Sequence, residues 1–364
     1  MTGGYRTRVR THIALVGSAA LTASLLTVGS IPVVAQDDAA ACDPTAGGKT
    51  YAYIKPGPDT WYQRDVDGFK FAAEADGNTV IEYDTAYDAE KELQNIANAV
   101  NEEVDGISMF SSTEAGATAA AEAGNEAGIP VVLTDSVGTV IANGTDHVAS
   151  IDFDWVGMGE SYAEWMADTY PDEAFYILTG IFGSPPSEKI NEGMTTKAEE
   201  LGVNELVGIQ ETGYSPDNAA QLAQDLLFAG EDFGLLFVMD EDMASAVIRM
   251  LRNEGVLNDP IKVFAQNGDP DVGVELLKDG SLHYTISSSP GWEGFVAYHA
   301  LNNYVSGCTD EINRQIMLPV IEVTSENMDD PTQVVPWKPD DIYWELTEQH
   351  YPDCLLYTSP SPRD

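Results

Sequence analysis

The sequence predicts an α/β protein built from two doubly wound lobes. Its 364 residues correspond to about two domains at roughly 150 residues each. From Lys49 onward, strand and helix patterns alternate without interruption, which is typical of βα units. The strand at 129–134 is a continuous apolar run, as expected for a parallel strand covered on both faces. With 43% hydrophobic and 21% charged residues, the composition is globular and excludes a disordered chain.

Residues 1–35 are interpreted as a signal peptide for export. Arg6, Arg8 and Arg10 form a basic region, and a long uncharged stretch of apolar and small residues follows them. Because this stretch is long enough to span a bilayer, a retained membrane anchor is the alternative. Residues 36–48 are expected to be a linker to the first domain.

The other end of the chain is interpreted as foreign. Residues 354–364, CLLYTSPSPRD, match the translation of a transposase adapter used to prepare sequencing libraries. They are therefore not expected to belong to the fold, and the natural sequence beyond Asp353 is expected to be missing.

Two cysteines remain, Cys42 and Cys308. Cys42 follows three alanines at the place where a lipoprotein cysteine would stand, although Asp37 and Asp38 separate it from the apolar stretch. In an exported protein the pair is also free to form a disulfide bond. A disulfide, a lipid anchor at Cys42 and two free thiols are therefore all open.

The elements of the first lobe follow one another up to residue 134. Apolar residues at i, i+3, i+4 and i+7 from Leu93 to Val100 predict one face of a helix. In order, the predicted elements are a strand at 50–54, a helix at about 61–75, a strand at 79–83, a helix around 93–100, a strand at 106–110, a helix at 115–127 and a strand at 129–134.

A second series of elements begins after a turn rich in Gly, Asn and Asp at 138–146. Ser215, Pro216 and Asp217 are a helix start signal for a helix that ends near Phe228. Ligands of open α/β folds bind at the carboxyl ends of the strands, so the cleft between two such lobes is the expected site. The predicted strands are at 147–151, 175–178, 206–210, 235–239, 261–265 and 284–287, with helices between them.

The chain is strongly acidic. It has 17 Lys and Arg against 60 Asp and Glu, a formal net charge of −43, and the acids are spread along its whole length. Such a surface repels nucleic acid and anionic lipid, so neither is an expected partner. The pattern favours adaptation to salty surroundings, where counterions screen repulsion beyond about 3–8 Å. An ordinary acidic secreted protein is the alternative.

No motif for catalysis, metal binding or phosphate binding is present. The sequence lacks HExxH, P-loop, GxSxG and CxxC patterns, and its histidines show no ligand spacing. No cofactor and no metal are therefore expected.

One segment, KPGPDTWYQ at 55–63, points to a ligand. It directly follows the first predicted strand, so it lies at the carboxyl end of the sheet. Trp61 and Tyr62 are costly to expose unless they stack on a flat, partly apolar ring such as a sugar. Lys55 and Asp59 would form charged hydrogen bonds with hydroxyl groups at its edge. Inward packing of Trp61 at the start of a helix is the alternative.

The chain resembles the sugar-binding proteins of ABC importers, the group that includes ribose-, arabinose- and galactose-binding proteins. The resemblance covers about residues 49–327, and the 55–63 segment is most similar to the arabinose-binding branch. It implies two lobes joined by three crossings, near Phe153, Ser289 and Ile321. The implied first lobe is 49–152 plus 290–320, and the second is 153–289 plus 321–353.

The resemblance also implies a set of ligand-binding residues. Asp135 would accept hydrogen bonds from two neighbouring hydroxyl groups, Lys189 would reach the ligand from a loop, and Tyr214 would add an aromatic ring. Asp240, after Met239, stands where the family has Asn. The carboxylate of Asp240 would equally suit an amine-bearing ligand. The implied set is Lys55, Asp59, Trp61, Tyr62, Asp135, Lys189, Tyr214, Met239, Asp240, Asn267, Asp269 and Ser288.

Structural roles are the alternative for some of these residues. Asp135 and Asn267 would then cap the helices that follow them, and Met239 would belong to the core.

The implied function is binding rather than catalysis. We expect an exported, monomeric substrate-binding protein of an ABC importer, in the periplasm or at the cell surface. Its lobes would close by hinge bending around a monosaccharide, a pentose or a hexose, and a membrane permease would recognise the closed form. A sugar-sensing subunit for a chemoreceptor or histidine kinase is one alternative. A carbohydrate-active enzyme, which would convert the sugar, is the other.

Overall fold

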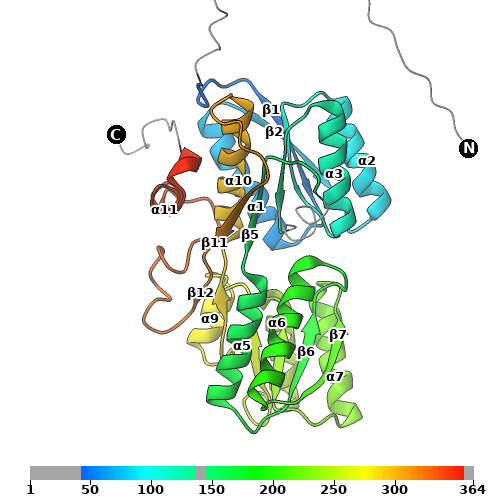
Figure 1. The fold of residues 1–364 in the computed structure, drawn as a ribbon. Coiled ribbons are helices and arrows are strands. Elements are labelled where there is room, and N and C mark those ends of the chain that lie inside the picture. The colour runs from blue at the N-terminus through cyan, green and yellow to red at the C-terminus, as the bar shows by residue number, and fades with distance from the viewer. Residues whose placement is uncertain (1–41, 136–143, 356–364) are drawn as a thin grey trace, which may run out of the picture. The chain divides into compact units, whose positions relative to one another are not determined.

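The computed structural model describes residues 42–135 and 144–355 (Figure 1). The predicted signal peptide, the linker before residue 42, most of the turn at 138–146 and the tail beyond residue 355 lie outside the described residues. Within the described part of the chain, no helix has the length and apolar character needed to cross a membrane.

The chain folds into two α/β lobes, each with its own parallel sheet. In the first lobe the described residues form a six-stranded sheet with the order β11-β5-β4-β3-β1-β2, and each neighbouring pair is parallel. Its strands are β1 (Thr50–Lys55), β2 (Thr79–Asp84), β3 (Gly106–Phe110), β4 (Val131–Thr134), β5 (Ala149–Phe153) and β11 (Arg314–Leu318).

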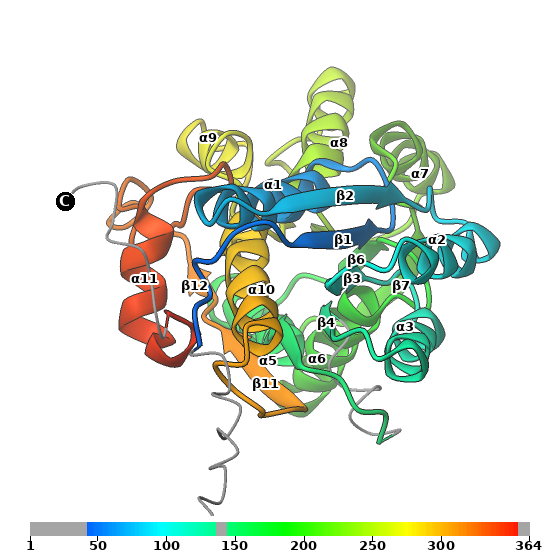
Figure 2. The same cartoon turned by 90° about the horizontal axis from the view of Figure 1, so that it is seen from above.

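Helices cover both faces of this sheet (Figures 1 and 2). On one face α1 packs against α10, and on the other α2 packs against α3. The strands between them, β3, β4 and β5, are buried along their whole length, which is why apolar residues run continuously through the strand predicted at 129–134. The helices are α1 (Thr60–Ala75), α2 (Ala89–Asn101), α3 (Glu114–Ala127) and α10 (Pro290–Val305).

The second lobe has a four-stranded parallel sheet with the order β7-β6-β8-β9. Its helices pack in pairs, α5 on α6 and α7 on α8. Ser215 caps α7 by accepting a hydrogen bond from the backbone N–H of Asn218, with Pro216 in the first turn, so this helix begins where the sequence predicts. The elements are α5 (Trp155–Thr169), β6 (Phe175–Thr179), α6 (Pro185–Leu201), β7 (Leu206–Glu211), α7 (Pro216–Ala229), β8 (Leu235–Val238), α8 (Glu241–Glu254), β9 (Lys262–Ala265) and α9 (Gly273–Lys278).

Three connections join these two sets of elements. The chain leaves the first sheet at the end of β5, at Phe153, and enters α5 at Trp155. It returns from β10 (Ile286–Ser287) to α10, and it passes again from β11 to β12 (Ile321–Glu322). Strands β10 and β12 pair with each other in antiparallel fashion.

The C-terminal segment differs from the lobe assignment made from the sequence. Residues 342–353, expected in the second lobe, pack against α10 of the first (Figures 1 and 2). Helix α11 (Ile342–His350) places Tyr343 and Trp344 edge-on against Phe295, with ring centroids 5.7 and 4.8 Å apart. A short 3-10 helix (Pro352–Leu355) follows it and buries Cys354, whose carbonyl accepts a hydrogen bond from Asn303, so residues 354 and 355 pack in the fold although the sequence predicted otherwise. Burial of these aromatic rings against α10 is the physical reason for the difference.

A disulfide bond joins Cys42 and Cys308. It links the segment before β1 to the residues just after α10. Nearby, the Asn302 side-chain amide donates a hydrogen bond to the Pro44 carbonyl, at 2.8 Å. Of the three states considered for these cysteines, the structure contains the disulfide. Cys42 in this bond has no free sulfur to carry a lipid.

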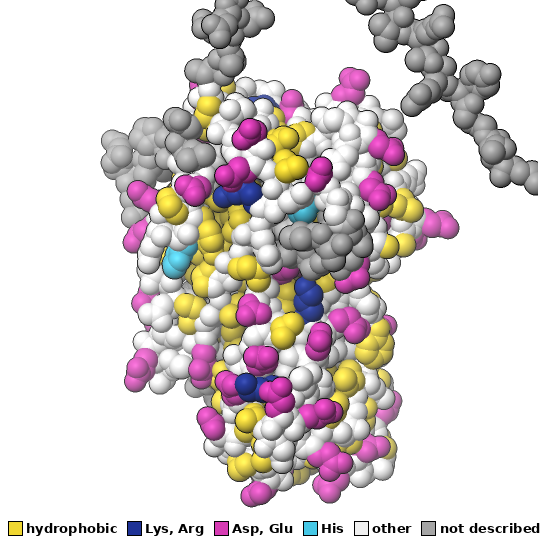
Figure 3. Space-filling model, in the orientation of Figure 1, with side chains coloured by type: hydrophobic (Ala, Val, Ile, Leu, Met, Phe, Trp, Pro, Cys, Tyr) yellow, Lys and Arg dark blue, Asp and Glu magenta, His cyan; other side chains and the backbone are white. Residues whose placement is uncertain are grey.

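Acidic side chains are scattered over the molecular face seen in Figure 3, where Lys and Arg are few. The sequence shows the same imbalance, with 60 acidic against 17 basic residues. On this face the acids are separated from one another rather than gathered in one patch (Figure 3). Their mutual repulsion is therefore distributed and depends on screening by salt.

Candidate functional site

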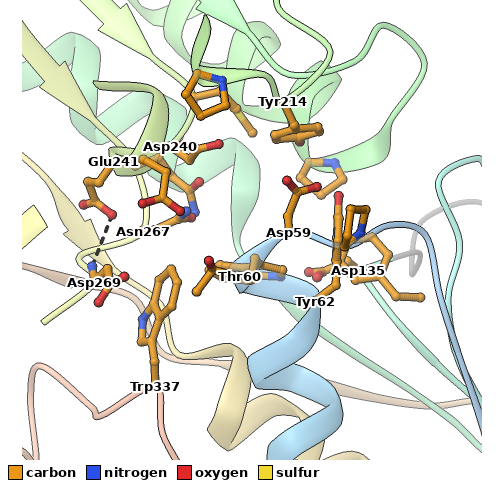
Figure 4. Close-up of a pocket in the computed structure, with 18 of the residues that line it drawn as sticks. Asp59, Thr60, Tyr62, Asp135, Tyr214, Asp240, Glu241, Asn267, Asp269 and Trp337 are labelled. Atoms are coloured by element: carbon orange, nitrogen blue, oxygen red, sulfur yellow. Dashed lines mark hydrogen bonds between the residues drawn. The ribbon is translucent and has the colours of Figure 1, made fainter. Parts of the chain in front are cut away.

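A pocket of about 220 Å³ lies at the carboxyl ends of the parallel strands of both lobes (Figure 4). This volume is below the range of about 300–1,000 Å³ typical of drug-sized ligands, which favours a small ligand. Most lining residues follow a strand directly or begin the next helix. They are Pro58, Asp59, Thr60, Trp61, Tyr62, Phe110, Asp135, Trp155, Pro186, Tyr214, Pro216, Met239, Asp240, Glu241, Asp242, Gln266, Asn267, Asp269 and Trp337.

Aromatic rings form one wall of this pocket. Helix α1 begins at Thr60, so its first turn presents Trp61. The Trp61 ring centroid lies 6.2 Å from that of Trp155, at the start of α5, and 5.3 Å from that of Trp337, edge-on. We call Trp61, Trp155 and Trp337 the tryptophan wall. It presents partly apolar, flat surfaces of the kind that pack on a ring.

Two tyrosines lie elsewhere around the pocket (Figure 4). Tyr62 is buried and meets Phe110 edge-on, with ring centroids 4.8 Å apart. Tyr214 follows β7, and its hydroxyl lies 3.1 Å from the Ser187 hydroxyl. A Cβ at Gly180 would lie 2.2 Å from a ring carbon of Tyr214, so this close approach requires glycine there.

Several site residues have a left-handed backbone. The φ angles are 52° at Asp135, 53° at Tyr214 and 123° at Asn267. Non-glycine residues rarely adopt such angles, and they cluster at functional sites when the surrounding structure holds them. At Asp135 the backbone N–H is held by the Ile151 carbonyl at 3.0 Å. The strand ends therefore hold these residues in strained conformations at the pocket.

Asp240 caps helix α8 and also lines the pocket. One of its carboxylate oxygens accepts a hydrogen bond from the backbone N–H of Met243 at 2.7 Å. Burial, together with the nearby Asp242 and Asp59 carboxylates, raises the pKa of Asp240 to about 7. Near neutral pH this group is therefore divided between its charged and neutral forms.

Asp59, which directly precedes α1, is another acid of the pocket lining. The Tyr87 hydroxyl donates a hydrogen bond to its carboxylate. Burial and the nearby Asp242 carboxylate together raise the pKa of Asp59 to about 6.

Glu241 holds the loop that presents Asn267 and Asp269. Its carboxylate accepts hydrogen bonds from the backbone N–H of Gly268 at 2.7 Å and from the Thr285 hydroxyl at 2.6 Å. The second oxygen accepts from the backbone N–H of Asp269 at 3.2 Å. Glu241 therefore shapes the site through the loop after β9. Burial raises the pKa of Asp269 to about 6.

Asp135 faces the pocket and belongs to a buried acid cluster, which we define as Asp65, Asp135, Asp152 and Glu293. All four side chains are at most 2% exposed. Neither oxygen of Asp135 nor either oxygen of Glu293 has a hydrogen-bond partner. Burial raises the pKa of Asp135 well above its usual range, and the neighbouring Asp152 and Asp65 carboxylates raise it further.

Three residues implied by the resemblance do not line this pocket. Lys55 is buried, and its ammonium lies 2.8 Å from a Glu82 oxygen and donates to the Gln63 side chain at 2.7 Å. Two acids on β2 therefore take up its charge, since Asp84 also lies 3.8 Å away. Lys189 is half-buried on α6, outside the lining. Ser288 is buried, and its hydroxyl accepts from Gln266 at 3.3 Å.

Several lining residues were not predicted from the sequence. Trp155 and Glu241 follow predicted strands but do not belong to any motif of the resemblance. Gln266 directly precedes the expected Asn267. Trp337 lies beyond residue 327, where the resemblance ends, and no signal in the sequence would have found it. Its indole N–H donates to the Ser288 carbonyl at 3.1 Å, which fixes the ring at the pocket.

The sequence is similar to known binding proteins. A family described as periplasmic binding protein domain matches residues 52–309. A fructose import binding protein from Bifidobacterium longum is 28% identical over 338 residues, which covers 88% of this chain and 97% of the relative. A ribose import binding protein from Salmonella typhimurium is 26% identical over 243 residues, covering 66% and 79%.

Solved structures share the fold. An ABC transporter solute-binding protein from Burkholderia graminis, in complex with D-arabinose, superposes with a TM-score of 0.71 at 20% identity. The superposition covers 78% of this chain and 98% of that protein.

Proposed function

Because the chain belongs to the periplasmic binding protein family, we propose that it is the substrate-binding protein of an ABC importer and binds a monosaccharide. The family location is extracytoplasmic, and its members bind ligands rather than convert them. One observation carries the proposal. Of the twelve residues that the resemblance implies, all but Lys55, Lys189 and Ser288 line a single pocket.

The composition of the pocket suits a small polyol. The tryptophan wall offers flat apolar surface to the C–H face of a sugar ring. Carboxylates accept from hydroxyl groups, while the Asn267 and Gln266 amides both donate and accept. When a site excludes water, each buried ligand hydroxyl needs a partner, and leaving one unpaired costs about 1–3 kcal/mol. Specificity for one sugar would then follow from the arrangement of the polar groups.

We further propose hinge closure as the binding movement. The three connections near Phe153, Ser289 and Ile321 would bend, bringing the strand ends of the two lobes together around the ligand. The first lobe would comprise 49–152 and 290–320, with 342–355 packed on α10. The second would comprise 153–289 and the chain from 321 to Trp337. A membrane permease would recognise the closed form, and the disulfide favours a protein without a lipid at Cys42.

A thermal-shift screen tests the proposed function. Pentoses, hexoses, polyols and amino sugars are offered to the protein at low and high salt, with gluconate and glucose 6-phosphate as anionic controls. A ligand at about 100 times its dissociation constant stabilises the folded state by about 2.7 kcal/mol, which raises the melting temperature of a chain of this size by about 4 °C.

The expected result is a rise with at least one sugar or polyol, which mass spectrometry then recovers unchanged. The anionic controls should give no rise, because no described lining residue is cationic. A chain that binds none of the neutral or amine-bearing compounds, or one that converts its ligand, would contradict the proposal.

A further inference from the structure

We propose that this pocket prefers a ligand bearing a positively charged amine, such as an amino sugar or an amino-substituted cyclitol, over its neutral counterpart. The inference rests on the proposed function, because it takes the pocket to bind a small polyol. It concerns the charge of that ligand, which the family resemblance leaves open.

The pocket lining is rich in acidic side chains. Among the described lining residues there is no Lys, Arg or His. Lys55, one of the two cations that the resemblance implies, has its ammonium engaged by Glu82 and Gln63. The carboxyl groups that line the pocket are Asp59, Asp135, Asp240, Glu241, Asp242 and Asp269.

Asp135 is the first of two acidic poles. Its side chain is fully buried, it lines the pocket, and neither of its oxygens has a hydrogen-bond partner. The Trp155 indole N–H and the Glu293 carboxyl lie close enough to influence it, but neither makes a hydrogen bond of good geometry. Buried polar groups are almost always paired, so this carboxyl lacks a donor that a ligand would supply.

Asp240 is the second pole, on the other lobe. It lies near Asp59 and Asp242, which act on it as like charges. Only one oxygen of Asp240 is used by the cap of α8. Both oxygens of Glu241, by contrast, accept hydrogen bonds from the loop after β9. Glu241 is therefore a positioning residue and not part of this pole. In Figure 4 Asp59, at the start of α1, points toward Tyr214, and Asp240 lies on the same lobe as Tyr214.

A neutral sugar provides no counter-charge for the carboxyl groups of Asp135 and Asp240. Without an opposite charge, burial keeps the Asp135 carboxyl in its neutral form, and closure disfavours the charged form of Asp240 as well. An ammonium group brings the missing charge and three N–H donors. The net charge of −43 also concentrates cations around the protein.

A bare metal ion is a weaker candidate for the same charge. No group of three or more His, Cys, Asp or Glu side chains in the described part of the chain is arranged to hold one. The two acidic poles stand on different lobes and beside aromatic rings, so they suit a larger organic cation.

Isothermal titration calorimetry with matched ligand sets tests the preference. The first set is glucose, glucosamine and N-acetylglucosamine, the second is the same series of galactose, and the third is myo-inositol with its amino-deoxy derivative. Titrations at about pH 6.5 keep the amines charged, and the acetylated sugars control for size. We expect the amine to bind at least tenfold more tightly than its neutral partners in at least one set.

Variants then locate the preference. Asp135→Asn and Asp240→Asn keep the shape of each side chain but cannot ionise opposite an ammonium group, so at least one should reduce the preference below threefold. Asp225→Asn, at an exposed position of α7 outside the pocket lining, is the matched control and should leave it unchanged. Melting curves confirm that each variant is folded.

The outcomes separate the two proposals. Neutral ligands that bind as tightly as the amines in every set would overturn the inference and leave the proposed function standing. An amine preference that survives both Asn variants would overturn its assignment to these acids. If no compound of any set binds, the inference fails together with the proposed function.

Discussion

Replacing Glu293 by glutamine is expected to stabilise the protein increasingly as the pH rises. Glu293 lies on α10, is fully buried, and has no hydrogen-bond partner on either oxygen. It faces Asp65 on α1, Asp135 after β4 and Asp152 on β5. Burial raises the pKa of Glu293 well above its usual range, and these three carboxylates raise it further. Glu293 therefore keeps its proton in the folded state at neutral pH.

The magnitude follows from proton linkage. In the unfolded chain a glutamic acid releases its proton near pH 4.5, so above that pH the folded state binds one more proton than the unfolded state. The free energy of unfolding of the wild type then falls by about 1.4 kcal/mol per pH unit on account of this group. Glutamine has the shape of the protonated acid and does not titrate. The advantage of Glu293→Gln should therefore grow by about 2 kcal/mol between pH 6 and pH 7.5.

Urea unfolding at several pH values between 5 and 8 measures this difference directly. The denaturant dependence should be the same for both proteins, so that midpoints report stability. Glu126→Gln, at an exposed position of α3, is the matched control and should show no growing difference with pH. A difference between Glu293→Gln and wild type that stays constant over this pH range would refute the reasoning. So would a variant that is less stable than wild type at pH 8.

Three further predictions concern the surface, the disulfide and Lys55. Raising NaCl from low to molar concentration should raise the unfolding midpoint, because salt screens the repulsion among surface acids, and a flat response would remove the idea of salt adaptation. Cys308→Ser should lower the free energy of unfolding by about 2–4 kcal/mol, and an intact mass that does not change on reduction of the wild type would contradict the disulfide. Lys55→Met should cost about 1 kcal/mol of stability, since it removes the buried ammonium from Glu82 and Gln63 while Lys70 still pairs with Glu82, yet change ligand affinity less than threefold. A tenfold loss of affinity at full stability would instead make Lys55 a ligand residue.

Those parts of the fold that depend on local pattern could be predicted from the sequence. The apolar run ending at Thr134 is a strand, because a strand buried on both faces has no polar side to show. The edge strand β11 was missed, because only Ile316 and Leu318 in Arg314–Leu318 are buried. The placement of α11 was also missed, since it depends on contacts of Tyr343 and Trp344 with Phe295, about fifty residues earlier.

Some residues of the candidate site could likewise be predicted from the sequence, and others could not. Asp135, Asp240 and Asn267 follow predicted strands, and the carboxyl ends of parallel strands converge, so their meeting in one pocket was predictable. The position of Lys55 was not, because it depends on the register that places Lys55 opposite Asp84 on the neighbouring strand. Trp337 comes from an irregular connection near the C-terminus, and only the folded chain brings it to Trp61.

If a ligand ring rests on the tryptophan wall, removing the Trp61 indole should weaken binding. The dissociation constant of the tightest ligand from the screen is determined for wild type, for Trp61→Ala and for Trp344→Ala. Trp344 is the matched control, a half-buried tryptophan on α11 outside the pocket lining. We expect at least tenfold weaker binding, about 1.4 kcal/mol, for Trp61→Ala and unchanged binding for Trp344→Ala. Binding by Trp61→Ala within threefold of wild type would contradict this prediction.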